Sequence, residues 1–244
     1  MSLKEYNIFD KPLESLPNKK LLINTINAYS YVMTKKDALF KESLLKCQVL
    51  IPDGVSIVWA VNFLFTKKIK KIAGADLFYY EMNKLNKVGG KCFFLGSSQD
   101  TLYKIQAKAS KEFPNVVLEL FSPPYKSTFS DEENAEMITR VNNFNPDVLF
   151  VGMTAPKQEK WAYANYSQLN INAHIGCIGA VFDFYAGKVN RAPKWMINAG
   201  LEWFYRLCKE PKRLWKRYII GNTKFIIHVF SEKFNPFFNK KSRS

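Results

Sequence analysis

Residues that hold metals or form disulfides are scarce in this chain. It has only two histidines and four cysteines, and the cysteines are scattered at Cys47, Cys92, Cys177 and Cys208 without a C-x-x-C pair. With so few and so scattered candidates, neither a disulfide framework nor a zinc site is expected, and reduced thiols fit the cytosol. No Asp-x-Asp pair offers a site for a divalent ion either. We therefore expect no metal and no cofactor.

Two common nucleotide-binding fingerprints are also missing. The chain contains neither G-x-G-x-x-G nor G-x-x-x-x-G-K-[ST]. These glycines let the backbone approach a dinucleotide or a triphosphate. Their absence argues against an NAD-dependent oxidoreductase and against a P-loop NTPase.

Long apolar runs are absent too. The longest, 55–65, contains Asn62 and is shorter than the roughly 18 residues that a membrane-spanning helix needs. The first 20 residues lack the apolar centre of a signal peptide. We expect a cytoplasmic protein whose contact with a membrane, if it has one, is peripheral.

What the chain does have is positive charge concentrated at one end. The net charge is +15 over 244 residues. Residues 188–244 hold 14 Lys and Arg but only three acidic residues, whereas the rest is nearly balanced. Such an excess indicates a polyanionic partner, which can be nucleic acid, an anionic lipid surface or a phosphorylated substrate.

Short apolar runs alternate with amphipathic stretches over 20–190, which predicts an α/β fold with a Rossmann-like, largely parallel sheet flanked by helices. The clearest unit is 91–114, where an apolar strand ends at Gly96 and a helix follows. We assign 1–190 to a catalytic domain. The expected strands lie within 20–28, 47–54, 91–98, 116–121, 146–153 and 173–184.

From Arg191 the pattern changes to large apolar residues that alternate with basic ones in a helical rhythm, with Pro211 separating two short helices. A basic amphipathic segment with tryptophans is typical of an anionic membrane surface. In the alternative, its aromatic residues pack on the main domain and a solvated face carries the charge. We predict that 191–244 is a basic amphipathic helical appendage that associates with the membrane and completes the active site.

Ligands of open α/β sheets bind at the carboxyl ends of the strands, so the loops there are the first candidates. Thr25 and Asn27 lie at or just past the first strand, where they can bind a substrate or cap a helix. Asp53 follows the second strand and precedes Gly54. A carboxylate there can act as the general base of a sugar transfer, although spacing alone favours a helix cap.

Three later loops carry further candidates. Gly96 and Ser97 form a strand-to-helix turn whose N–H groups suit a diphosphate. Lys157 and Gln158 follow the fifth strand, and the Gln158 amide can bind sugar or phosphate or merely belong to a helix start. Asp183 is expected at the end of the sixth strand, where it binds a base or ribose or caps a turn.

Without a metal, side-chain cations must neutralise a departing diphosphate. The candidates in the basic segment are Arg206, Arg213 and Arg217, and Arg191 is expected to bind the substrate.

Seven blocks, in order, resemble the motifs of glycosyltransferase family 26, the TagA/WecG/CpsF family, from about Asn24 to Asn222. The resemblance implies a metal-independent, inverting transfer of a hexose, such as an N-acetylmannosamine-type sugar, from a UDP-sugar to a polyprenyl-diphosphate-linked saccharide. That chemistry builds teichoic acid linkage units, enterobacterial common antigen or exopolysaccharide at the inner face of the bacterial membrane, with self-association there plausible. The blocks are PDGVSIVWA, AGADLF, FLGSS, FSPPY, VGMTAPKQEKW, FDFYAGKVNRAPKWM and GLEWFYRLCKEPKRLWKRY.

The resemblance also assigns roles. Asp53 matches the proposed catalytic base, Thr25 and Gln158 line the same pocket, and Asp183 lies where the family binds the nucleotide. The family's basic C-terminal segment attaches the enzyme to the membrane and closes over the site, and Arg206 and Arg213 match it.

Two positions depart from the family pattern. Lys71 stands before AGADLF where Arg is common, and Lys216 also stands where Arg is often found. A lysine keeps the charge but loses the bidentate geometry of Arg, so a phosphate-binding role for Lys71 is weakened.

A nucleic-acid-binding protein, with the basic aromatic segment contacting phosphates and stacking on bases, is the competing interpretation. The helical spacing of Trp and Leu argues against it, and we expect no nucleic acid partner.

Overall fold

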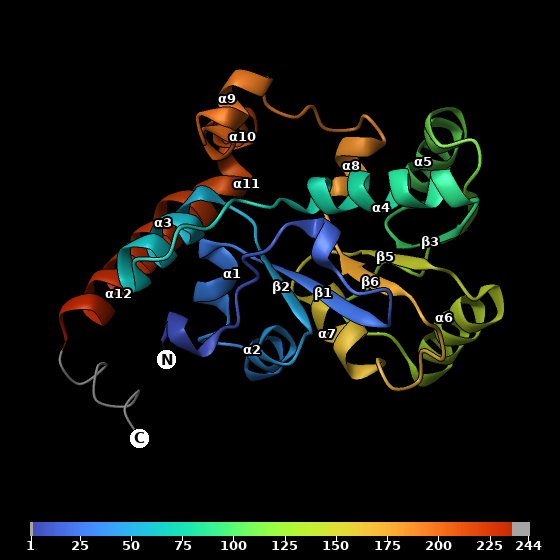
Figure 1. Cartoon of the computed structure of the whole chain (residues 1–244), viewed down its shortest axis with the longest axis horizontal. Helices are drawn as coiled ribbons and strands as arrows, with labels where there is room; N and C mark the ends of the chain where they lie inside the picture. Colours follow the sequence, from blue (N-terminus) through green and yellow to red (C-terminus); the bar gives the residue numbers. More distant parts are fainter. Residues whose placement is uncertain (1, 236–244) are drawn as a thin grey trace.

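A computed structural model describes residues 2–235 and places a parallel sheet at the centre of the molecule (Figure 1). The strand order is β2-β1-β6-β5-β3-β4, and every neighbouring pair is parallel. The predicted fold class is confirmed. The strands are β1 (Leu21–Ile26), β2 (Val49–Pro52), β3 (Lys91–Gly96), β4 (Val117–Phe121), β5 (Val148–Gly152) and β6 (His174–Cys177).

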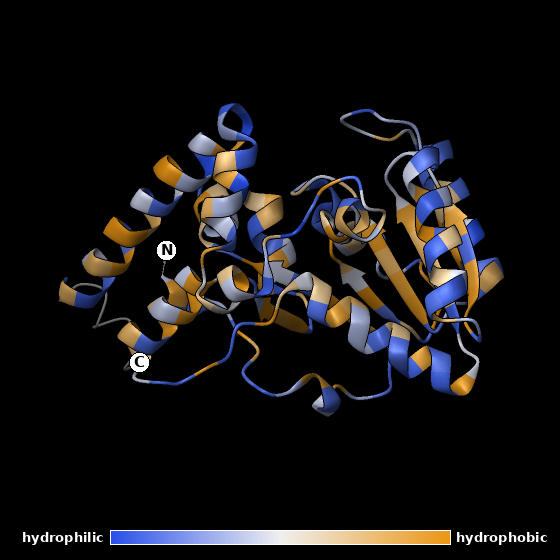
Figure 2. Cartoon of the chain, turned by 90° about the horizontal axis from the view of Figure 1, so that it is seen from above, coloured by the Kyte–Doolittle hydropathy of each residue, from blue (hydrophilic) through white to orange (hydrophobic). Residues whose placement is uncertain are grey.

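Each predicted apolar run contains one of these strands, because a parallel sheet covered on both faces needs apolar residues at nearly every position. All of β5 is buried, and Figure 2 shows the strands as largely hydrophobic. The sixth run is corrected in one respect. Its strand ends at Cys177, and the short helix α8 (Val181–Tyr185) follows, so Asp183 lies in a helix and not at a strand end.

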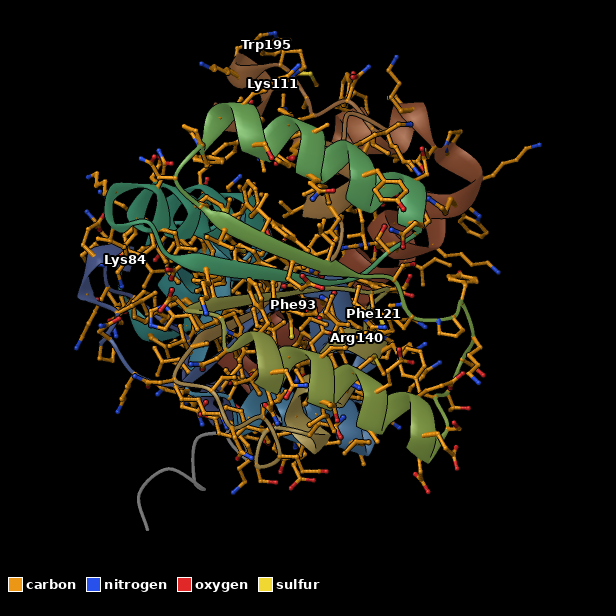
Figure 3. The ribbon with its side chains drawn as sticks, turned by 90° about the vertical axis from the view of Figure 1, so that its right-hand side faces the viewer. Lys84, Phe93, Lys111, Phe121, Arg140 and Trp195 are labelled. Atoms are coloured by element: carbon orange, nitrogen blue, oxygen red, sulfur yellow. The ribbon has the colours of Figure 1, made fainter. Side chains whose placement is uncertain are left out.

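Helices cover both faces of the sheet. α4 (Gly74–Val88), α5 (Gln99–Glu112) and α8 pack on the face of Phe94 and Phe150. α6 (Asp131–Phe144) and α7 (Lys157–Ala164) pack on the opposite face, which contains Phe93. Figure 3 shows Phe93 and, at the β4 edge, Phe121, over whose ring the Arg140 guanidinium lies at 4.4 Å.

A third apolar core lies beyond the β2 edge. It joins α1 (Ala28–Met33), α2 (Ala38–Leu45) and α3 (Val55–Phe65) to α12 (Asn222–Phe234), with Phe225 and Val229 of α12 fully buried. The ring of Tyr31 meets that of Phe225 at 5.3 Å. The short 3-10 turns η1 (Leu3–Glu5) and η2 (Leu13–Ser15) precede the sheet.

The C-terminal segment contains α9 (Lys194–Asn198), α10 (Glu202–Lys209), α11 (Pro211–Trp215), the π-helical η3 (Lys216–Gly221) and α12. Pro211 does begin a new helix, since proline suits a first helical turn. The prediction of two short helices is nevertheless wrong for the second, because α11, η3 and α12 follow one another without a break to Phe234. Residues 236–244 of the predicted 191–244 appendage lie outside the described part.

None of the helices within 2–235 is both long and apolar enough to cross a membrane.

Candidate active site

A cavity of about 1290 Å³ lies where the strands end, bounded on its other side by α10 and η3. It is lined by residues at or after the ends of β1, β2, β3, β5 and β6. The structure brings all the predicted site residues to this cavity. They are Thr25, Asn27, Asp53, Lys71, Gly96, Ser97, Lys157, Gln158, Asp183, Arg191, Arg206, Arg213 and Arg217.

Asp53 directly follows β2, and its N–H donates to the carbonyl oxygen of Ile26 at 2.8 Å, which fixes it beside the end of β1. The N-cap of α3 is Gly54, at φ +133°, and no side chain caps this helix. The capping interpretation of Asp53 is therefore wrong, and its carboxylate is left to the cavity.

Charges of both signs act on Asp53. Burial raises the pKa of the Asp53 carboxyl, and the negative charge of Glu202 raises it further. The positive charges of Arg217, Lys71 and Arg206 act in the opposite direction, but the net shift is upward. A carboxylate whose pKa is raised is a stronger base.

Glu202 is a site residue that the sequence interpretation missed. It opens α10, and its carboxylate faces Nε of Arg191 at 3.4 Å and Nζ of Lys71 at 3.8 Å. The available signal was its place as one of three acidic residues in a strongly basic segment. Arg191 and Lys71 are thus partly neutralised.

The turn after β3 has the backbone expected of an anion-binding loop. Gly96 has φ +116°, and a Cβ atom there would lie 2.5 Å from the carbonyl oxygen of Gly152. Ser97 also has a positive φ of 61°, and Ser98 caps α5, whose first turn carries N–H groups free to bind anions. Lys188 lies beside this turn, with Nζ 3.3 Å from Oγ of Ser98.

At the end of β1, Thr25 and Asn27 have different structural roles. Asn27 is the N-cap of α1: its Oδ1 accepts from the N–H of Ser30 at 3.0 Å. The capping interpretation is confirmed for Asn27, which also lines the cavity. Thr25 is half-buried within the strand.

The first turn of α7 contributes three neighbours of different character. Nζ of Lys157 donates to the backbone carbonyl oxygen of Lys126 and lies over the Phe129 ring, so it ties α7 to the loop before α6. Gln158 is buried against the cavity. Glu159, which was not predicted as a site residue, is buried there as well, and burial raises its pKa to about 7.

The arginines of the C-terminal segment turn inward. The guanidinium of Arg206 lies 5.1 Å from the Phe184 ring, and that of Arg217 lies 5.5 Å from the Tyr29 ring. Their buried Nε atoms have no hydrogen-bond partner among the described residues. Arg213 pairs with Glu210, and the charge of Asp183 is among those that raise the pKa of Arg213. Cations thus face a cavity able to hold an anion.

Within residues 2–235 no group of three or more His, Cys, Asp or Glu side chains is arranged to hold a metal ion.

Comparison with known proteins finds two similar proteins of the same name in Bacillus. The chain is 31% identical to N-acetylglucosaminyldiphosphoundecaprenol N-acetyl-beta-D-mannosaminyltransferase of Bacillus subtilis (strain 168), over 88% of this chain and 80% of the relative. It is 27% identical to the protein of the same name from Bacillus spizizenii, over 88% and 81%. The model of the glycosyl transferase WecG/TagA/CpsF family matches residues 3–238. The chain therefore belongs to the WecG/TagA/CpsF family of glycosyltransferases.

Proposed function

We propose that this glycosyltransferase moves an N-acetylmannosamine-type sugar from a UDP-sugar to a polyprenyl-diphosphate-linked saccharide, in the synthesis of a cell-surface polymer such as teichoic acid. The observation that carries the proposal is the position of Asp53, a carboxylate of raised pKa in a cavity that lysine and arginine side chains also line. The printed activity of the Bacillus relatives supports the sugar and the acceptor.

The transfer is a single displacement. The ionised Asp53 takes the proton of an acceptor hydroxyl as that oxygen attacks the anomeric carbon of the donor. The bond from this carbon to the β-phosphate oxygen breaks, UDP leaves with the electron pair, and the configuration inverts. Arg206, Arg217 and the N–H groups after β3 stabilise the negative charge that grows on the diphosphate.

Replacing the base tests this role. Asp53→Asn keeps the shape of the side chain but cannot take a proton, so turnover with UDP-N-acetylmannosamine and a GlcNAc-diphosphate-lipid acceptor should fall about 100-fold or more. UDP binding, followed by calorimetry, should persist. Asp131→Asn, at an exposed position at the start of α6, is the matched control. Turnover of Asp53→Asn within a few-fold of wild type would show that Asp53 is not the base.

We further propose that the protein meets the membrane through a surface other than the predicted amphipathic pair. Arg206, Arg213 and Arg217 line the cavity, and Leu214 is buried, so that segment uses much of its charge inward. α3 and α12 instead lie side by side and carry an exposed apolar surface (Figure 1).

This surface, which we call the α3–α12 ridge, consists of Trp59, Phe63, Phe230 and Phe234. The rings of Trp59 and Phe63 stack at 5.3 Å, and Phe230 meets both from α12. Phe234 is 69% exposed.

The surroundings of the ridge are basic. Nζ of Lys233 lies 5.3 Å from the centre of the Phe63 ring and donates to the backbone carbonyl oxygen of Phe63 at 2.9 Å. Lys67, Lys68 and Lys70, which follow α3 in the chain, are exposed, although Lys67 pairs with Asp10. The acidic residue of α12, Glu232, is buried. Apolar rings framed by lysines fit an anionic lipid surface. Val55, at the start of α3, lines the cavity, so a lipid-linked acceptor can reach the site from the ridge.

The double variant Trp59→Ser/Phe230→Ser removes two large rings from the ridge, so its binding to phosphatidylglycerol vesicles should weaken about tenfold or more in a sedimentation assay. Tyr103→Ser, an exposed aromatic residue of α5, is the control. Transfer to a short-chain, water-soluble acceptor should be unchanged. Unaltered vesicle binding by the double variant would exclude the ridge, and stronger binding to RNA than to vesicles would favour the nucleic-acid interpretation.

A further inference from the structure

One buried carboxyl group in the cavity wall, that of Glu159, has no part in the transfer described above. Glu159 is 2% exposed, and its Oε2 has no hydrogen-bond partner among the described residues. A carboxylate enclosed in this way, without a cation in contact, is costly to bury. The contacts of its other oxygen indicate what it does.

Oε1 of Glu159 accepts a hydrogen bond from Nε2 of Gln158 at 2.9 Å. At the other end of the same amide, the N–H of Met153 donates to Oε1 of Gln158 at 3.2 Å. Gly179 leaves room for this arrangement, since a Cβ atom there would lie 3.0 Å from the Gln158 Oε1. Both ends of the Gln158 amide are therefore held by fixed neighbours.

These neighbours allow only one orientation of the amide. If it were reversed, its carbonyl oxygen would face the Glu159 carboxylate and its NH₂ group would face the N–H of Met153, which places acceptor against acceptor and donor against donor. With Glu159 ionised, the second hydrogen of Gln158 Nε2 is left to a ligand, while the carbonyl oxygen is held toward the N–H of Met153. A protonated Glu159 can itself donate, which loosens this constraint.

Glu159 changes its protonation near neutral pH, and with it the hold of its carboxyl group on the Gln158 amide. Burial raises the pKa of the carboxyl to about 7, while the hydrogen bonds from Gln158 and from the Glu159 backbone and the charge of Arg217 act against this. Arg217 belongs to η3 on the opposite side of the cavity, and its positive charge lowers the pKa of Glu159.

We propose that Glu159 is a positioning residue, which holds the Gln158 amide as a hydrogen-bond donor toward oxygen atoms of the bound nucleotide sugar. The identity of that ligand rests on the proposed function, but the orientation of Gln158 does not.

The first test needs no ligand. The side-chain amide of Gln158 is followed by ¹H–¹⁵N NMR in the full chain, assigned by its loss in Gln158→Met. In wild type its resonances should shift between about pH 6 and 8, following the Glu159 carboxyl, and in Glu159→Gln they should not. Resonances that are flat with pH in wild type, or that titrate unchanged in Glu159→Gln, would overturn the inference.

The second test is affinity for UDP-N-acetylmannosamine, measured by calorimetry. Glu159→Met removes the acceptor of the Gln158 hydrogen bond and should weaken binding about tenfold, the loss expected for one hydrogen bond. Glu159→Gln can still accept from Gln158 through its own carbonyl, so its affinity should stay within about threefold of wild type. Glu136→Met, on the exposed face of α6, is the control.

A double-mutant cycle separates positioning from general damage to the fold. If Glu159 acts through Gln158, the double variant Gln158→Met/Glu159→Met should bind no more weakly than Gln158→Met alone. Additive losses, or wild-type affinity in Glu159→Met, would contradict the inference. If wild type itself fails to bind the nucleotide sugar, the proposed function is wrong, and the NMR titration still decides the role of Glu159.

Discussion

Asp53 and Glu202 both line the cavity, and the effect of the Glu202 charge on Asp53 should help to set the pH dependence of the enzyme. Burial and the charge of Glu202 raise the pKa of Asp53. If Asp53 is the proposed base, it works only when ionised, so we expect activity to be lost as the pH falls through a pKa above the ordinary value of 3.8.

Glu202→Gln removes one of the two causes of that shift and frees Lys71 and Arg191 to act on Asp53. Both changes lower the pKa of Asp53. The acid limb of kcat/KM against pH should move to lower pH, whereas Glu136→Gln, at an exposed ion pair, should leave it in place. An acid limb that stays put or moves upward in Glu202→Gln would contradict this account of the charges.

At the scale of single residues, the sequence identified groups by their place after apolar runs. This worked for Asp53, Gln158 and Ser97, because strand ends of a parallel sheet meet at one edge. It could not identify Glu159 or Glu202. Glu159 is marked by a buried carboxyl oxygen without a hydrogen-bond partner among the described residues, and Glu202 by two cationic partners. Burial and ion pairing of this kind depend on how distant parts of the chain pack together. The roles of all these side chains stay predictions.

Among the elements, the strands were predictable because their residues are apolar on both faces, whereas the boundaries of helices were less so. The run 173–184 reads as one strand, but at Gly179 the backbone takes φ +41° and the chain turns into α8. The continuity of the helix after Pro211 was missed because it depends on Phe225 and Val229 finding a core with Tyr31 and other residues of distant elements.

The end of β3 offers a test of the backbone. Gly96→Ala places a methyl group 2.5 Å from the Gly152 carbonyl oxygen, at a φ of +116° that alanine adopts with strain. We expect a loss of about 2 kcal/mol or more in the free energy of unfolding, measured by denaturant titration. Gly187→Ala, at φ +72° with no atom within 4 Å, should cost only about 1 kcal/mol. Equal effects of the two would show that the contact between β3 and β5 is looser than described.

At the scale of the whole molecule, η1 and α12, which are far apart in the sequence, meet at the third core. The N–H of Leu3 donates to Oε2 of the buried Glu232 at 2.9 Å, so the start of the chain holds the end of α12. Deleting the segment after Val189 would expose this core, which is why substitutions on the α3–α12 ridge are the cleaner test of membrane binding.

The excess of positive charge in the C-terminal part of the sequence is divided between two places in the folded molecule. Arginines of the C-terminal segment line the cavity, while Lys233 of α12 lies against the Phe63 ring of the ridge. In the proposed function, the arginines serve a diphosphate and the ridge serves a lipid surface, and the two-part division at about residue 190 stays a functional proposal.

In the proposed function, the cavity binds a uridine diphosphate through side chains and backbone N–H groups. This binding can be measured by calorimetric titration of the full chain with UDP, without added divalent metal and with ADP, GDP and NAD as controls. We predict saturable binding of UDP that is at least about tenfold tighter than that of the other nucleotides and that weakens in Arg206→Gln. Absence of UDP binding, or a preference for NAD, would contradict it.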